Sequence, residues 1–118
     1  MSDITSLLVE KRPSGLLVIR VSGDLDSLGT HMVEEDFNRA VAGQSARVLV
    51  DLSGVRFISS AGMAMLLVSG KTLRQNGGSL LLTGANARVM EVLAMTGINQ
   101  MFDFYPTLAE ALDALERS

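Results

Sequence analysis

The sequence contains no cysteine and no tryptophan, and aromatic residues amount to only 4%. The absence of cysteine excludes disulfide bonds and thiolate metal sites, and it is consistent with a reducing compartment. Because aromatic residues are scarce, the core must be built mainly from Leu, Val, Ile, Met and Ala. Hydrophobic residues make up 47% of the 118 residues, which is enough for such a core. We therefore expect residues 1–118 to form a single domain.

Long apolar runs and an excess of positive charge are also missing. No apolar run approaches the roughly 18 to 20 residues that span a bilayer, and the N-terminus lacks the basic-then-apolar pattern of a secretory signal. The net charge of −3 argues against nucleic acid as the main partner, because binding its phosphate backbone requires a basic patch. We expect a cytoplasmic protein with no direct membrane contact and no nucleic-acid partner.

The first half of the chain alternates between strand and helix patterns. Apolar, β-branched runs at 4–10 and 16–22 flank a proline and glycine turn signal and predict a hairpin. Residues 29–43 show helical periodicity. Residues 46–53 form a continuous apolar run, which is typical of a strand buried on both faces.

The second half repeats this alternation. A helix is predicted at 60–76, where it ends at two glycines, and a buried strand at 79–83. A short helix is expected at 85–97 and a short strand within 98–105. A capping box at 107–110 opens the last helix. The order predicts an α/β fold with a mixed, mostly parallel sheet of four to five strands and about four helices.

The carboxyl ends of the parallel strands are the expected place for a functional site. Three segments should gather there. They are the turn from Asp24 to Asp26, the loop from Asp51 to Ser60, and the turn after Thr83.

Two adjacent serines begin the second helix. Ser59 or Ser60 stands at the N-cap, where a serine oxygen often accepts a hydrogen bond from a free amide. A phosphate at the same place would lie beside unpaired N–H groups and the positive end of the helix dipole. It would add about −1.5 to −2 charges, so a partner would sense it more strongly than the fold would. Carboxylates at Asp24 and Asp26 would oppose such a phosphate by repulsion.

The helix at 60–76 is apolar on two sides. The stripe expected to face the sheet comprises Met63, Leu66, Leu67, Gly70 and Leu73. The opposite stripe comprises Ala61, Met65, Val68 and Thr72. Either another helix covers this second stripe, or the stripe is a contact surface beside Ser60. A homodimer through the same stripe is a further option.

Patterns that indicate catalysis are weak in this chain. Asp24-x-Asp26 resembles the nucleophile spacing of haloacid dehalogenase-type phosphatases, but such a pair is also ordinary turn chemistry. The single histidine, His31, is expected on a polar helix face. Ser60 lacks the G-x-S-x-G elbow of serine hydrolases. The sequence therefore predicts a non-enzymatic protein with no catalytic residue, no metal site and no cofactor.

Three segments resemble the STAS domain family, the fold of anti-sigma factor antagonists. VLVDLSGVRFISSAGMAMLL (48–67) resembles the family signature of a strand, a Ser/Thr-rich step, a glycine and an apolar helix. GDLDS (23–27) resembles its acidic turn, and TGINQMFDFYPTLAEAL (96–112) resembles its C-terminal part. The chain departs from the pattern at Ser59, where many phosphorylated members have Asp, and at Ala61, where they often have Ser or Thr.

The resemblance implies a phosphorylation-switched binding protein. The unphosphorylated form would bind an anti-sigma factor that is also a serine kinase, and so free a sigma factor. The kinase would then end the binding by phosphorylating one serine, and a serine phosphatase would reset the switch. The acceptor falls on Ser60, with Ser59 as second choice.

The expected partner-binding residues surround this serine or follow its helix: Asp24, Asp26, Ser59, Ala61, Gly62, Met65 and Val68. The alternative is a non-phosphorylated STAS scaffold, or an accessory subunit of a multi-protein regulatory or transport complex.

Overall fold

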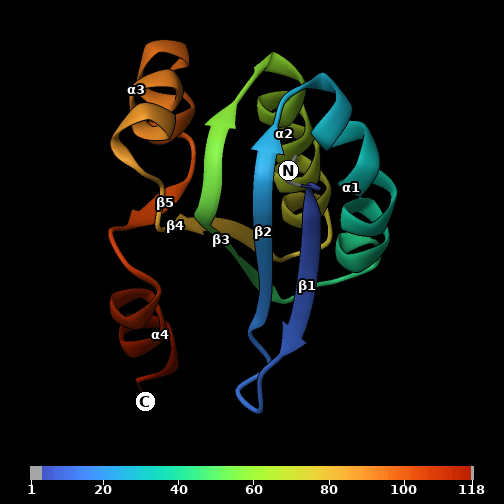
Figure 1. Cartoon of the computed structure of the whole chain (residues 1–118). Coiled ribbons are helices and arrows are strands. Elements are labelled where there is room, and N and C mark those ends of the chain that lie inside the picture. Colours follow the sequence, from blue (N-terminus) through green and yellow to red (C-terminus); the bar gives the residue numbers. More distant parts are fainter. Residues whose placement is uncertain (1–3, 118) are drawn as a thin grey trace.

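A five-stranded sheet in the order β1-β2-β3-β4-β5 runs through the molecule (Figure 1). The computed structural model describes residues 4–117. The strands are β1 (Ser6–Lys11), β2 (Leu17–Leu25), β3 (Arg47–Ile58), β4 (Ser79–Thr83) and β5 (Asp103–Tyr105). β1 pairs antiparallel with β2, and the other neighbours pair in parallel. The predicted hairpin and the mixed, mostly parallel sheet are confirmed.

Four α-helices connect or follow the strands. They are α1 (Ser27–Val41), α2 (Ser60–Gln75), α3 (Ala87–Thr96) and α4 (Leu108–Glu116), with a 3-10 turn, η1 (Ile98–Gln100), before β5. The helix ends follow local chemistry. The Asn86 side chain accepts a hydrogen bond from the Val89 amide at 2.8 Å, and the Thr107 side chain accepts one from the Glu110 amide at 3.1 Å. The second N-cap agrees with the capping box expected at 107–110, and asparagine is a preferred residue at the first.

The central strands of the sheet, β2, β3 and β4, carry buried residues on both faces, because alternate residues of a strand point to opposite sides. The larger core cluster takes Leu17, Ile19 and Val21 from β2 and includes buried residues of α1, α2 and α3. The smaller cluster takes Leu16 and Val18 from the same segment and includes buried residues of α4. Three helices therefore cover one face, and α4 covers part of the other.

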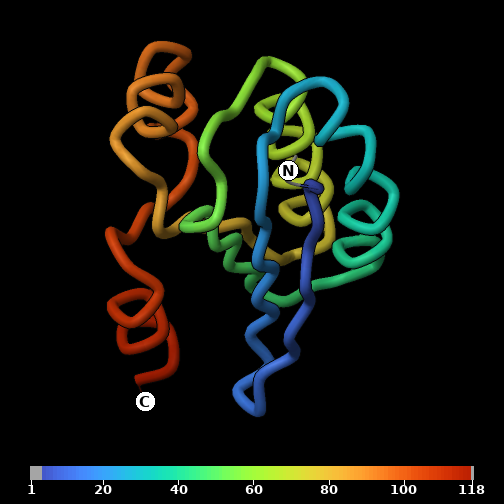
Figure 2. The backbone as a smooth tube through the Cα atoms, in the orientation of Figure 1, coloured from blue at the N-terminus to red at the C-terminus, as the bar shows by residue number. Residues whose placement is uncertain are grey.

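The path of the chain separates α4 from the other helices. Figure 2 follows the chain from the N-terminal hairpin (blue) to α4 (red). In this view α4 lies at the lower left, whereas α1 lies at the right. Within the part of the chain that the structure describes, no helix is both long and apolar enough to cross a membrane.

Candidate functional site

The carboxyl end of β3 continues as strand much further than the sequence pattern indicated. We expected a strand to residue 53 and a loop from Asp51 to Ser60, but β3 reaches Ile58, which pairs with Leu25 of β2. The register between the two strands shifts twice along this extension. A Cβ on Gly54 would lie 2.8 Å from the Ser22 hydroxyl oxygen, so this glycine permits close approach. The start of α2 is thus fixed to the sheet edge.

Ser59 and Ser60 have different surroundings. Ser59 is the N-cap residue of α2, but its side chain makes no capping hydrogen bond. Instead, its backbone N–H and its hydroxyl both donate to the Leu25 carbonyl oxygen, at 2.9 and 3.0 Å. Ser60 is the first helical residue and is exposed. Its hydroxyl makes no hydrogen bond with any part of the described chain, so the structure leaves it available to an approaching molecule.

The acidic residues at this edge are held by nearby partners. Asp24 accepts hydrogen bonds from Arg56 at 3.2 and 3.3 Å. Asp26 caps α1 by accepting a hydrogen bond from the Gly29 amide at 2.7 Å. The Arg56 charge offsets that of Asp24, so the repulsion that we expected between these carboxylates and a phosphate is reduced. Sequence reasoning missed Arg56, because its pairing with Asp24 depends on the extended register of β3.

The rotation of α2 differs from the expected one. Met65 was predicted on the stripe facing away from the sheet, but it is 2% exposed and belongs to the larger core cluster. Gly62 is also buried, so neither residue is placed to touch a partner. α1 packs beside α2 (Figure 1) and shares this cluster with Met65 through Val33 and Phe37. Of the two alternatives that the sequence left open, the covering helix applies to Met65.

The side of α2 that faces solvent starts at Ser60. We call it the outer face of α2; it consists of the exposed Ser60, Ala64, Val68 and Lys71 and of the half-buried Leu67, which the sequence pattern had placed on the stripe facing the sheet. Val68 is 60% exposed, which corresponds to the alternative of an uncovered surface. Ala61, which we expected on the same surface as Val68, is half-buried. Ala64, Leu67 and Val68 make the centre of this face apolar, and the exposed Ser60 lies at its N-terminal end.

Side chains that could bind a metal ion are not grouped at this edge among the residues that the structure describes. Among residues 4–117, no group of three or more His, Cys, Asp or Glu side chains could hold a metal ion. His31 is exposed on α1. The arrangement offers a hydroxyl at a helix start and a neighbouring apolar surface, which together suit a protein contact.

Comparisons with known proteins agree with this fold. The family model described as STAS domain matches residues 8–111. The chain is 29% identical to an anti-sigma F factor antagonist of Paenibacillus polymyxa over 103 residues, which cover 86% of this chain and 88% of that protein. It is 25% identical over 100 residues to the anti-sigma-F factor antagonist RsfB of Mycobacterium tuberculosis, with 84% and 80% covered.

A solved structure gives the same result for the whole fold. The crystal structure of an anti-sigma factor antagonist from Mycobacterium paratuberculosis superposes with a TM-score of 0.85 at 28% identity. The match covers 98% of this chain and 99% of that one.

Proposed function

Because the chain belongs to the STAS domain family, we propose that it is an anti-sigma factor antagonist. It binds an anti-sigma factor in the cytoplasm, so that the sigma factor is released, and it does this without catalysing a reaction of its own. The names of its relatives support the role. The observation that carries the proposal is Ser60, an exposed hydroxyl at the first residue of α2, directly above the apolar outer face of that helix.

Ser60 is the proposed phosphoacceptor, and the anti-sigma factor is the proposed serine kinase. Two points favour Ser60 over Ser59. The Ser60 side chain is exposed, whereas the Ser59 hydroxyl is committed to the Leu25 carbonyl at 3.0 Å. A phosphate on Ser60 would also lie at a helix N-terminus, where the dipole favours negative charge. The fold can therefore keep its shape when Ser60 is modified.

Phosphorylation would end the binding by electrostatics and desolvation. A phosphate adds about −1.5 to −2 charges, and burying such a group without a cationic partner is costly. The unmodified surface presents Ser60, Ala64 and Val68 to the anti-sigma factor, with Asp24 and Asp26 at its edge. A serine phosphatase restores this surface by removing the phosphate.

The test is affinity capture with three variants and mass spectrometry of the retained proteins. We expect wild type and Ser60→Ala to retain an anti-sigma factor with a kinase-type ATPase domain, and Ser60→Asp to lose it. Ser45→Asp is the matched control. Ser45 is exposed and precedes β3. The Ser45→Asp substitution therefore adds the same charge at the opposite end of the strands and should leave binding intact. Circular dichroism verifies that all variants are folded.

A second readout tests the acceptor itself. Incubation with the retained partner and ATP should add one phosphate to wild type and to Ser45→Asp, and none to Ser60→Ala. Retention of the same partners by Ser60→Asp, with no phosphate added to wild type, would overturn the proposal in favour of a constitutive scaffold or accessory subunit.

A further inference from the structure

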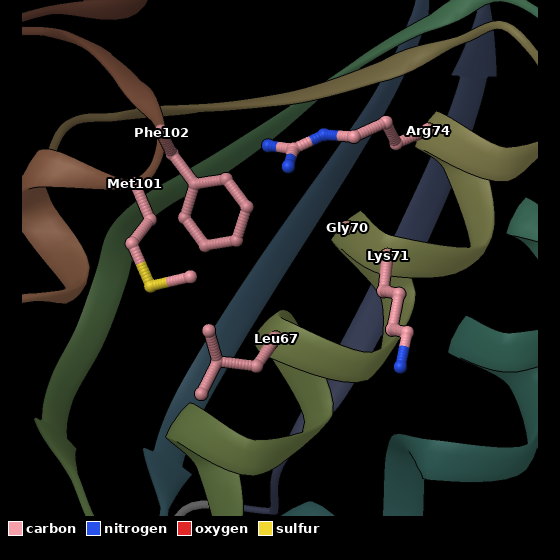
Figure 3. Close-up of a pocket in the computed structure, with 6 residues that line it drawn as sticks. All are labelled: Leu67, Gly70, Lys71, Arg74, Met101 and Phe102. Atoms are coloured by element: carbon pink, nitrogen blue, oxygen red, sulfur yellow. The ribbon is translucent and has the colours of Figure 1, made fainter.

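A hollow lies between the C-terminal half of α2 and the segment that leads into β5 (Figure 3). Its larger part has a volume of about 310 Å³ and is lined by Leu67, Gly70, Lys71, Arg74, Met101 and Phe102. A smaller part of about 240 Å³ shares four of these residues and extends to Ser79, Leu80 and Asp103. Because they share lining residues, the two parts adjoin, and both lie toward the opposite end of α2 from Ser60.

Gly70 and Phe102 form the floor of the hollow. A Cβ on Gly70 would lie 2.5 Å from Cε1 of the Phe102 ring, so the ring rests directly against the bare backbone of α2. Phe102 also packs against the larger core cluster. The floor is therefore an aromatic surface fixed by the core, and Leu67 and Met101 extend its apolar area.

The rim of the hollow on α2 is cationic. Lys71 and Arg74 are exposed, and neither forms an ion pair with a residue in the range 4–117. In Figure 3 the Arg74 side chain extends across the hollow toward the Phe102 ring. No acidic residue lines the larger part, and Asp103 lines only the smaller one. The larger part thus combines an apolar floor with two positive charges.

We infer that this hollow binds a small organic anion that carries an apolar, preferably aromatic, body and a carboxylate. The body would lie on Phe102 and Met101, because aromatic rings pack favourably on flat apolar surfaces. The carboxylate would meet Arg74, whose planar guanidinium suits two-point binding of carboxylates. The volume of the larger part, about 310 Å³, lies at the lower end of the roughly 300 to 1,000 Å³ of ligand pockets, which limits the ligand to a small molecule.

The position of the hollow connects it to the outer face of α2. Leu67 and Lys71 belong both to that face and to the lining. A bound anion would therefore alter the charge and the apolar area next to Val68. The binding itself uses neither Ser60 nor a partner protein, and it can be tested when the proposed function fails.

The experiment is a titration of the isotope-labelled full chain, followed by the backbone amide signals in NMR spectra. The probe is 3-phenylpropanoate, which joins a phenyl ring to a carboxylate. We expect saturable shifts at Gly70, Phe102 and Asp103, with a Kd on the order of 1 mM for a ligand of this size. The neutral 3-phenylpropan-1-ol and the ring-free acetate should each bind more weakly.

Two variants and a matched control locate the binding. Arg74→Gln should weaken binding by about fivefold or more, as expected for the loss of a partly exposed charge contact, and Lys71→Gln should weaken it less. Arg88→Gln removes an exposed cation from α3, away from the hollow, and should change nothing. The inference is overturned if 3-phenylpropanoate causes no saturable shifts, if the alcohol binds equally well, or if Arg74→Gln binds like wild type.

Discussion

Gly62 lies where α2 packs closely against the ends of β2 and β3. A Cβ at this position would lie 2.9 Å from the Leu25 carbonyl oxygen and 2.9 Å from Cγ1 of Ile58. The same carbonyl oxygen accepts both hydrogen bonds from Ser59. The missing side chain of Gly62 therefore lets α2 dock tightly enough for Ser59 to anchor the helix and for Ser60 to remain at the surface.

The Gly62→Ala substitution tests this close approach. Alanine favours a helix interior by about 1 kcal/mol over glycine, but overpacking costs about 1–3 kcal/mol, and the crowding atoms include backbone. We expect a net decrease in the free energy of unfolding on the order of 1 kcal/mol, measured by urea denaturation. The control is Ala64→Gly on the outer face of α2, which should show only the propensity loss. An increase in stability for Gly62→Ala would contradict the close packing.

The C-terminus of α4 is held to the rest of the domain by polar contacts. Arg12 donates to both carboxylate oxygens of Glu116, at 2.9 and 2.8 Å, and Ser14 donates at 2.6 Å. Arg47 donates to the Leu115 carbonyl oxygen at 2.6 Å. The hydrogen bonds from Arg12, followed by that from Ser14, lower the pKa of Glu116 below its ordinary value of 4.5. Arg12 and Ser14, in the turn between β1 and β2, thus bind the C-terminal end of α4 through Glu116.

The lowered pKa of Glu116 gives a pH dependence with a defined sign. A depressed pKa in the folded state means that the ionised side chain stabilises the fold above pH 4.5, and that this contribution is lost as the pH falls through the lower, folded-state pKa. Thermal melting should therefore show Glu116→Gln below wild type at neutral pH, with the two curves converging in acid. The control is Glu34→Gln on α1, because Glu34 forms no ion pair with any of the described residues. A difference between Glu116→Gln and wild type that is constant with pH would contradict the assignment.

The whole molecule is organised by strands that contribute to two cores at once. Val48 and Val50 of β3 join the larger cluster, whereas Leu49 joins the smaller one beneath α4. β2 and β4 alternate in the same way. Because each central strand belongs to both clusters, damage to one cluster should weaken the other.

This coupling predicts a single unfolding transition. Leu66→Ala, in the larger cluster, should lower the free energy of unfolding by about 2–5 kcal/mol. Tyr105 is the single tyrosine of a chain without tryptophan, and it packs against the smaller cluster, so its fluorescence reports on the α4 side. We expect the fluorescence and circular dichroism midpoints to shift together in denaturant. Two separated midpoints would show that the faces unfold independently.

At this largest scale, the sequence alone determined the order and type of the elements. Strand and helix periods are local properties of the chain, and so are the caps at Asn86 and Thr107 and the glycine that ends α3, Gly97. The sequence also placed the serine pair at the start of α2 and the acidic residues at the same sheet edge. These features need only neighbouring residues to be specified, which is why they could be predicted.

Only the tertiary structure decided which serine is free and which side of α2 meets solvent. α2 itself carries apolar residues on most of its sides, so the periodicity of its sequence could not determine which side faces the core. The packing of α1 buried Met65 and left Val68 exposed. The bond from Ser59 to Leu25 and the pair of Arg56 with Asp24 join segments more than 30 residues apart. Such contacts depend on strand register and helix docking, which arise from the simultaneous packing of the whole chain rather than from any local pattern.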